Sequence, residues 1–211
     1  MLVTAIYKKF NLPPNLVRHM AEVAAVSQFI MEHWTGPERF DHKLVIEAAL
    51  VHDLANIIKF KRPFKGDLEK NGDYWQQVQT EVIDKYGDDV HTATVEMIRE
   101  AGLTHITPII EDMFSMYTKD LKDGDKNPMV ESRIVELADD CVTPAGIVGF
   151  ETRMRDLYQR YNFTEKDAKA QRLIANKDWV QKRLDVDLTQ VDWGKVREKV
   201  GEYGEYEMVD K

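Results

Sequence analysis

The stretch VIEAALVHDLANII, residues 45–58, decides the fold. Ten of its fourteen residues are apolar and are spread all round a helix, which is typical of a helix buried at the centre of a protein. His52 and Asp53 lie in its middle, where burying an ionised carboxylate costs several kcal/mol unless it is paired or bound to a cation. Two interpretations follow: the pair binds a divalent metal, or it is a buried hydrogen-bonded pair without a metal.

Helix start and stop signals divide the rest of the chain. Asp41 caps the helix that contains this stretch, and Arg62-Pro63 ends it. The other expected helices begin at a capping residue or a proline and end before a glycine or a proline; they cover about residues 15–34, 73–86, 88–102, 164–184 and 191–200, with further starts at Thr107-Pro108, Asn127-Pro128 and Thr143-Pro144. No alternating run of strand length is present. The sequence therefore predicts an all-α fold of about eight or nine helices.

We expect a single domain over residues 1–211. Its core bundle covers about residues 15–145, and the helices of about residues 146–202 pack on that core rather than being linked to it flexibly. The polar end of the chain, residues 203–211, is expected to be frayed.

Charge and cysteine content exclude several classes of protein. The 211 residues carry 29 basic and 37 acidic side chains, a net charge of −8, without a basic run, which disfavours duplex nucleic acid as a partner. The single cysteine, Cys141, excludes an internal disulfide framework and a cysteine-rich zinc site. No stretch approaches the ~18 apolar residues of a membrane span, and the polar start lacks the apolar core of a signal peptide. We therefore expect a cytoplasmic protein without a membrane partner, and a homo-oligomer is compatible with this composition.

A second carboxylate for the site comes from the later helix VESRIVELADD, residues 130–140. Asp139 has Val135 one turn before it, so it borders the buried side of this helix. Asp140 instead shares a face with Glu136, and we expect it to be solvated or ion-paired. Asp139 is therefore the candidate for an inward-pointing metal ligand.

His19 lies on the first long helix, between Leu16 and Val23 of its apolar face. A single histidine in such a position is more often a core or interface side chain than a ligand. Its candidacy as a metal ligand depends on which residues the other helices bring near it.

Together these residues form a pattern, His19, then His52-Asp53, then Asp139, that resembles the H…HD…D signature of the HD-domain superfamily of metal-dependent phosphohydrolases. The intervals, 33 residues from His19 to His52 and 86 from Asp53 to Asp139, are within the usual range of that family, and the resemblance covers about residues 15–145. It implies an HD-domain-like helical bundle, here with additional C-terminal helices. It also implies that these four residues surround one divalent metal ion, which is Mn, Fe, Co, Ni, Mg or Zn.

His91 resembles an extra histidine that many members of this superfamily carry at a helix N-terminus. There it joins a second metal or contacts the substrate phosphate, whereas the alternative for His91 is an ordinary surface histidine. The further histidines of a dinuclear site are expected near the end of the next helix, EDMFSMY, where none occurs, and His105 comes too early. We therefore expect one metal, with His91 either supporting the metal ligands without binding the metal itself or contacting the substrate phosphate.

The group that would move a proton is not assigned by the sequence. Alarmone hydrolases and 5′-deoxynucleotidases of the superfamily typically carry an acidic residue three positions after the aspartate of the HD pair, but Asn56 stands there. This departure disfavours those two activities. Glu111 and Asp112 are candidate substitutes, although solvated helix positions explain both of them better.

Basic residues near the expected site are candidates for binding the substrate. Lys59, Lys61 and Arg62 follow the metal stretch, Arg18 precedes the first histidine, and Arg133 lies on the helix of the second carboxylate. Donors beside a metal-held phosphate stabilise its developing charge. A solvated helix end that complements the helix dipole explains Lys59 and Lys61 equally well.

The resemblance thus implies a metal-dependent phosphohydrolase that acts on a small phosphorylated compound such as a nucleotide. Asp53 and His91 are the candidate catalytic residues. Two alternatives remain open: a diiron oxygenase of the HD fold, which needs more histidine ligands, and a non-catalytic regulatory bundle that keeps the site for binding or stability.

Overall fold

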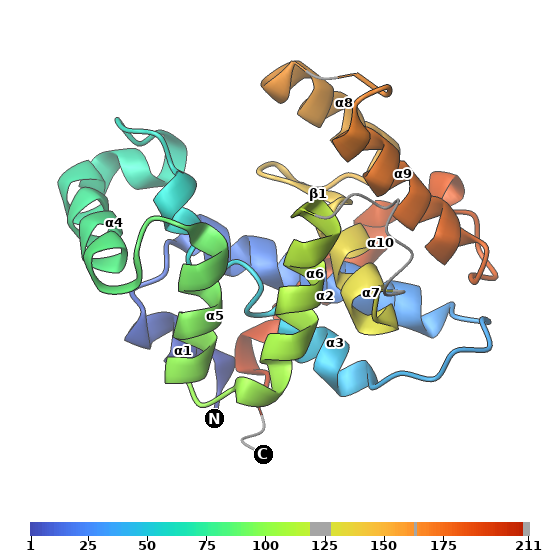
Figure 1. The fold of residues 1–211 in the computed structure, drawn as a ribbon, viewed down its shortest axis with the longest axis horizontal. Helices are drawn as coiled ribbons and strands as arrows, with labels where there is room; N and C mark the ends of the chain where they lie inside the picture. The colour runs from blue at the N-terminus through green and yellow to red at the C-terminus, as the bar shows by residue number, and fades with distance from the viewer. Residues whose placement is uncertain (119–127, 163, 209–211) are drawn as a thin grey trace.

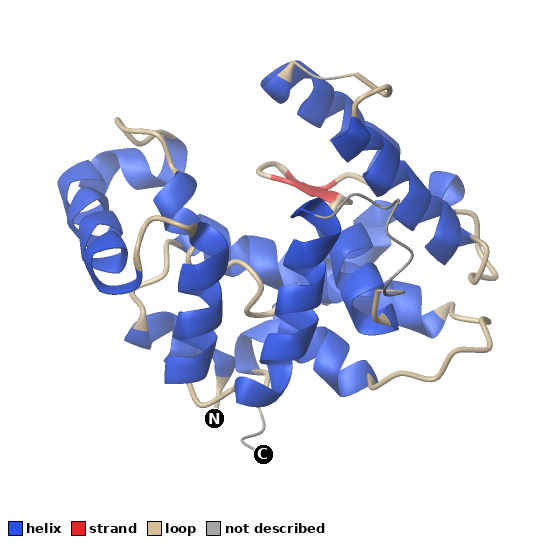
Figure 2. Ribbon diagram, in the orientation of Figure 1, coloured by secondary structure: helices blue, strands red, loops and turns tan. Residues whose placement is uncertain are grey.

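The computed structural model describes residues 1–118, 128–162 and 164–208. Ten α-helices lie in these ranges, so the predicted all-α class is confirmed (Figure 1). They are α1 (Val3–Lys9), α2 (Pro14–Glu32), α3 (His42–Ala49), α4 (Gly72–Tyr86), α5 (Val90–Glu100), α6 (Thr107–Thr118), α7 (Val130–Asp139), α8 (Phe150–Tyr161), α9 (Ala168–Gln181) and α10 (Trp193–Glu198). Short 3₁₀ helices connect them: η1 (Asn56–Lys59), η2 (Gly66–Asn71), η3 (Thr104–Ile106), η4 (Leu188–Gln190) and η5 (Lys199–Glu205). One antiparallel hairpin, β1 (Val142–Thr143) and β2 (Gly146–Ile147), is the only sheet in the described ranges (Figure 2).

Three helices form the centre of the molecule. α2 packs against α3 and α7, and α3 also packs against α7 (Figure 1). A continuous cluster of buried apolar side chains extends from Val3 to Met208 and includes Met20, Leu50 and Leu137. α4 lies to one side of this centre, and α8 and α9 lie to the other. Within the described ranges, no helix has both the length and the apolar character needed to cross a membrane.

α3 ends earlier than predicted. Asp41 caps its start, as expected, but the helix stops at Ala49 instead of continuing to about residue 60. The imidazole Nδ1 of His52 lies 2.8 Å from the Ala49 carbonyl, which is the group that would accept the Asp53 amide in a longer helix. Turns over residues 50–55 follow, so His52 and Asp53 lie on a turn rather than inside a helix.

Thr143-Pro144 forms the turn of the hairpin and not the predicted helix start. Thr143 Oγ1 accepts a hydrogen bond from the Ala145 amide and donates one to the Gly146 carbonyl. Gly146 has a φ of 115°, a backbone conformation that favours glycine. The prediction was wrong because a threonine hydroxyl makes the same kind of local bond in a turn as at a helix start.

Other helix starts lie close to their predicted positions. α9 begins at Ala168, because the Asp167 carboxylate accepts the Thr164 amide at 2.6 Å and keeps the preceding residues in a turn. α7 begins at Val130, while Asn127, the predicted cap, lies outside the described residues.

The C-terminal residues 203–208 are not frayed, contrary to the prediction. Tyr203 and Met208 are buried, and the first amide of α1 donates to the Tyr206 carbonyl at 2.9 Å. The tail is ordered because its few apolar side chains dock on the N-terminal segment. The polar composition of the tail gives no sign of this docking. Residues 209–211 lie outside the described residues.

Candidate metal centre

Three elements bring the four candidate ligands together. His19 lies in the first half of α2, His52 and Asp53 lie on the turn after α3, and Asp139 is the last residue of α7. Because α2 packs against both α3 and α7, these side chains meet at the junction of the three central helices.

The ligand atoms of these residues lie close to one another. His19 Nε2 is 3.0 Å from Asp139 Oδ1 and 3.5 Å from Asp53 Oδ2. His52 Nε2 is 3.9 Å from each of the same two oxygens. One ligand atom each of His19, His52 and Asp53 lie within 4.8 Å of one another, so this group could hold a metal ion. Oδ1 of Asp139 lies next to the Nε2 atoms of both histidines in this group.

These separations fit a single ion. Two ligands at about 2.1 Å from one metal are about 3.0 Å apart at a right angle and about 3.6 Å apart at 120°. The two contacts of His19, at 3.0 and 3.5 Å, lie in this range, and the 3.9 Å contacts of His52 correspond to a wider angle. Two imidazoles and two carboxylates suit Mn²⁺, Fe²⁺, Co²⁺ or Ni²⁺ better than a metal that prefers thiolates.

His52 has one ring nitrogen without a protein partner. Its side chain is 4% exposed, and its Nδ1 donates to the Ala49 carbonyl, which assigns the proton to Nδ1. Its Nε2 is buried and has no hydrogen-bond partner among the described residues. A hydrogen-bonded His–Asp pair would need a contact well below the 3.9 Å that separates Nε2 from Asp53. A metal ion would satisfy this nitrogen, and the Ala49 bond would orient the ring for it.

The charges around the site favour a cation. Burial alone would lower the pKa of His52, but the carboxylates of Asp53 and Asp139 outweigh it and raise that pKa to about 9. Burial acts to raise the pKa of Asp139, but His19 and His52 outweigh it and hold that pKa well below its usual range. Asp139 is therefore ionised at neutral pH, as a metal ligand must be.

Asp140 was predicted to be solvated or ion-paired, but it is buried and forms no ion pair among the described residues. It is 4% exposed, whereas 23% of the Asp139 side chain is accessible. Burial and the neighbouring charges of Glu136 and Asp139 raise the pKa of Asp140 well above its usual range. The reason is that α7 packs against α2, α3, α6 and α9, which together cover more than one of its faces.

Asn56 holds one oxygen of Asp53. Its Nδ2 donates to Asp53 Oδ2 at 2.6 Å, and this is the oxygen that faces both histidines. The neutral amide thereby fixes the carboxylate without competing for its charge, whereas a second carboxylate at this position would repel it.

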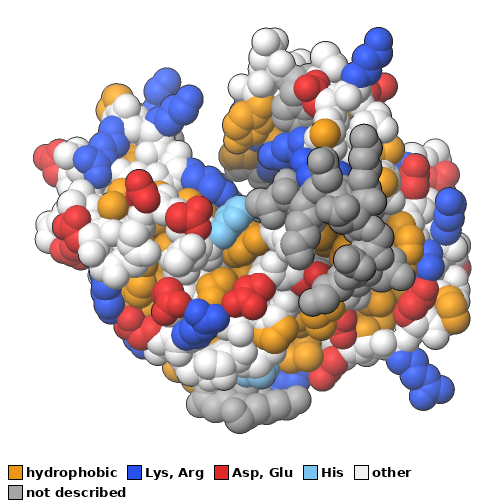
Figure 3. Space-filling view, viewed as in Figure 1, with side chains coloured by type: hydrophobic (Ala, Val, Ile, Leu, Met, Phe, Trp, Pro, Cys, Tyr) orange, Lys and Arg blue, Asp and Glu red, His pale blue; other side chains and the backbone are white. Residues whose placement is uncertain are grey.

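His91 lies beside this group and is not one of its members. Its ring stacks on Phe114, with centroids 3.8 Å apart and planes 7° apart. Burial and the charge of Lys59 lower the pKa of His91, while Asp89 and Asp53 act in the opposite direction. The stacked rings line a cavity of about 360 Å³. The space-filling view shows a hollow between the α4 side and the α8 side of the molecule, with histidine and basic side chains on its walls (Figure 3).

Four of the five predicted phosphate-binding residues are exposed, Arg62 among them. Lys59 ends η1, Lys61 follows it, and both side chains are exposed. Arg18 is also exposed, and its Nη2 lies 3.5 Å from the Pro144 carbonyl in the hairpin turn. The charge of Lys59 acts on His91, which places this lysine near the imidazole of His91.

Arg62 and Arg133 are held by neighbouring helices. Arg62 donates to Gln79 Oε1 at 2.6 Å and to Thr80 Oγ1 at 3.1 Å, both on α4. Arg133 donates to Asn176 Oδ1 at 3.2 Å, and its guanidinium lies 4.4 Å from the ring centroid of Trp179. Both guanidinium groups therefore contribute to helix packing.

The sequence did not identify two residues of this region. Glu22 is 5% exposed; burial raises its pKa, and the nearby charges of Arg18, His19 and Arg197 oppose that shift. Its position three residues after His19, on the same face of α2, is a signal that could have identified it. Phe114 carried no local signal, because only the packing of α5 against α6 brings its ring to the histidine.

Three other candidate residues have partners away from the metal group. Glu111 pairs with Arg99 at 3.0 Å, and Asp112 accepts the backbone amide that precedes α7 at 2.7 Å. His105 Nε2 lies 3.0 Å from an oxygen of the buried Glu47. These contacts give all three a structural role.

The group of His19, His52 and Asp53 could hold a cation, and Asp139 Oδ1 lies 3.0 Å from His19 Nε2. Such a site can activate a water molecule and hold an anionic substrate, or bind a metal without turnover. Comparison of the chain with protein-family models, with characterised proteins and with solved structures found no match.

Proposed function

We propose that this chain is a metal-dependent phosphohydrolase of the HD-domain type, in which His19, His52, Asp53 and Asp139 hold one divalent metal. The observation that carries the proposal is the buried Nε2 of His52, which has no hydrogen-bond partner in the described chain and faces two carboxylates at 3.9 Å. The order of the ligands along the chain and their origin from three packed helices support an HD-like bundle.

In the proposed reaction, hydrogen bonds hold the candidate metal ligands in fixed orientations. When bound here, a divalent ion supplies a water of lowered pKa and polarises a phosphoryl oxygen. Asn56 holds the carboxylate of Asp53 through Oδ2, and in this proposal that carboxylate orients the water. The Ala49 carbonyl fixes the ring of His52. Such support reduces the reorganisation that the reaction requires.

The surroundings support a small phosphorylated substrate. Asp53 and Lys59 both act electrostatically on His91, and in this proposal Lys59 and His91 donate to the phosphate oxygens. The cavity of about 360 Å³ that His91 and Phe114 line has room for the rest of a compound such as a nucleotide. Lys61 and Arg18 are exposed and assist by their charge.

One metal per chain is favoured over two. In the ranges that the structure describes, a single group of metal-binding side chains is found, and His91 is stacked on Phe114 outside it. A diiron oxygenase of the same fold needs additional ligands for its second iron.

The test measures metal content and activity on the same full-length protein. The chain is stripped with a chelator and reloaded with Mn²⁺, Fe²⁺, Co²⁺ or Ni²⁺, and bound metal is determined by mass spectrometry. Phosphate release is then followed with p-nitrophenyl phosphate and with nucleoside monophosphates. We expect one metal per chain and phosphate release that requires it.

Two matched variants assign the activity to this site. Asp53→Asn should lose phosphate release by more than about 100-fold, since even residues that only support metal ligands are worth about 10–100-fold. Asp84→Asn, the same change at an exposed position of α4, should retain it. Full activity without metal would refute the proposal. Two irons per chain would favour the oxygenase, and bound metal without hydrolysis of any ester would favour the binding bundle.

A further inference from the structure

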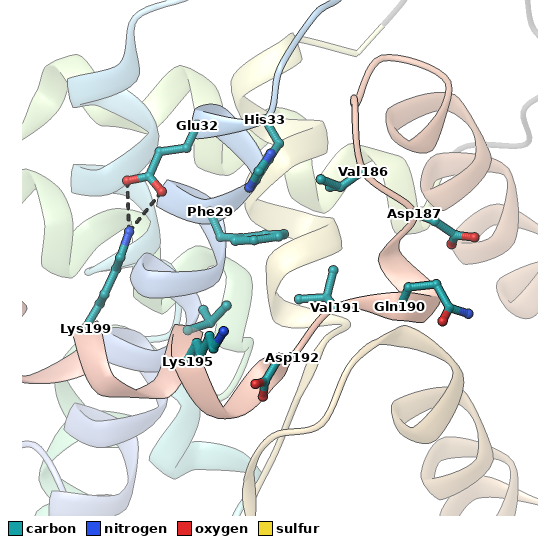
Figure 4. A pocket seen from close by; sticks show the side chains of 11 residues that line it. Phe29, Glu32, His33, Val186, Asp187, Gln190, Val191, Asp192, Lys195 and Lys199 are labelled. Carbon is teal, nitrogen blue, oxygen red and sulfur yellow. Dashed lines mark hydrogen bonds and ion pairs between the residues drawn. The ribbon is translucent and has the colours of Figure 1, made fainter.

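A second cavity lies at the far end of α2 from the metal group. Its volume is about 480 Å³, and it is formed by the end of α2, the segment of residues 186–192 and α10 (Figure 4). Phe29 lies ten residues after His19, which places it about 15 Å further along the helix axis. The cavity is therefore separate from the metal centre.

The floor of this cavity is apolar. Phe29, Val191 and Val196 line it, together with Val186. The Phe29 ring is held in place because it lies 4.6 Å from the His33 ring and 5.8 Å from the Trp193 ring, measured between centroids. A rigid aromatic ring among branched aliphatic side chains is suited to an apolar group of a ligand.

Some of the ionisable side chains at the rim are already paired. Lys199 binds both carboxylate oxygens of Glu32, at 2.9 and 3.1 Å (Figure 4). His33 Nδ1 lies 2.8 Å from Asp185 Oδ1. Neither of these two pairs offers a free charge to a ligand.

Asp187, Asp192 and Lys195 form no ion pair among the described residues, and Asp187 Oδ1 already accepts two hydrogen bonds from Thr189. Asp192 uses Oδ1 to accept the Gly194 amide at 3.1 Å, and no other hydrogen bond to its carboxylate is found in the described chain. Lys195 forms no ion pair with any described residue, although Asp192 is only three positions before it. Residues three apart at the start of a helix are neighbours. The rim thus presents one anion and one cation side by side, above an apolar floor.

We propose that this cavity binds a small α-amino acid with an apolar side chain. Its ammonium group binds the free oxygen of Asp192, its carboxylate binds the ammonium of Lys195, and its side chain covers Phe29 and Val191. An α-amino acid carries its two charges on one carbon atom, which matches an acid and a base on neighbouring positions. A plain carboxylic acid would leave Asp192 without a cation, and a plain amine would leave Lys195 without an anion.

The experiment compares four probes that differ in one group each. L-phenylalanine, 3-phenylpropionate, 2-phenylethylamine and L-serine are titrated into the full-length protein by isothermal calorimetry. We expect L-phenylalanine to bind in about the millimolar range or tighter, as its size allows. Each of the other probes should bind at least about tenfold more weakly, because each lacks the ammonium, the carboxylate or the apolar ring. Equal binding of any of them, or no binding of L-phenylalanine, would overturn the proposal.

Variants then test the position of the site. Lys195→Gln and Asp192→Ser should each weaken L-phenylalanine binding by about tenfold or more, and serine retains the helix-capping bond of Asp192. Lys182→Gln changes an exposed lysine outside the cavity and should leave binding unchanged. Equal effects of Lys195→Gln and Lys182→Gln would refute the assignment. Because Lys195 is exposed, its replacement tests the proposal even if the Asp192 variant is unstable.

Discussion

Replacing Asp139 by asparagine should empty the metal site at metal concentrations that fill the native protein. Asp139 Oδ1 lies 3.0 Å from His19 Nε2, a separation that two ligands of one ion adopt. At about 2.1 Å, a unit charge and a dication interact by roughly 4 kcal/mol even at the dielectric constant of water. This energy corresponds to about 10³-fold in affinity. Because the amide oxygen of asparagine can still coordinate, we expect a loss of about 10²- to 10³-fold.

The control is the same change one residue later. Asp140→Asn also replaces a carboxylate by its isosteric amide, but Asp140 has no contact with the two histidines in the structure. Burial raises the pKa of Asp140, so the fold already disfavours its charge, and removing it should leave stability unchanged or higher. We expect its metal affinity to stay within about tenfold of the native value.

Both variants are titrated with Mn²⁺ by isothermal calorimetry at neutral pH, and circular dichroism verifies that each is folded. An affinity of the Asp139 variant within tenfold of native would show that its carboxylate is not a ligand. An equal or larger loss in the Asp140 variant would show that the wrong aspartate has been assigned.

Three further outcomes are expected. Without added metal, the free energy of unfolding should fall by up to about 3 kcal/mol between pH 6.5 and 9. The raised pKa of His52 contributes stability that is complete below pH 6.5 and is lost as pH rises through about 9, so a flat pH profile in chemical denaturation would contradict this prediction. Arg133→Gln should cost about 1–2 kcal/mol in urea unfolding, through lost contacts with Asn176 and Trp179, at unchanged metal affinity; reduced metal binding would instead place it at the site. Deleting residues 203–211 should lower the calorimetric Tm by several degrees because it exposes the surface that the tail covers, whereas an unchanged Tm would fit a frayed tail.

Helix ends that depend on neighbouring residues could be predicted from the sequence. Asp41 and Asp89 cap α3 and α5 by accepting amides two or three residues later. Gly87 and Gly102 follow the ends of α4 and α5 with φ values of 87° and 81°. All the atoms of these contacts lie within one helical turn, so the local sequence contains the information.

Features that depend on distant contacts could not be predicted in this way. Tyr203 lies in a polar segment, and only the docking of the chain ends against each other buries it. Thr143 could make its local bonds in a helix start or in a turn, and the packing around the hairpin decides between them.

The assignment of Asp140 to a solvated face was wrong for a related reason. A helical wheel separates an apolar from a polar face, and it assumes that the polar face meets water. α7 is covered by four other helices, so polar residues such as Glu136 and Asp140 are buried as well. The wheel directs Asp139 toward the buried side, and the packing of α7 on α2 brings its Oδ1 to 3.0 Å from His19 Nε2.

The early end of α3 has a consequence for the chemistry of the site. In a continuous α-helix, adjacent side chains point about 100° apart, so His52 and Asp53 would diverge from a common ion. On the turn that follows Ala49, His52 Nε2 and Asp53 Oδ2 lie 3.9 Å apart. The bond from His52 Nδ1 to the Ala49 carbonyl occupies the acceptor that would extend the helix, and it also directs Nε2 toward the carboxylates. An uninterrupted helix over residues 45–58 would therefore not let His52 and Asp53 approach one ion. The turn after Ala49 interrupts the helix, and this interruption is what lets the two side chains approach each other.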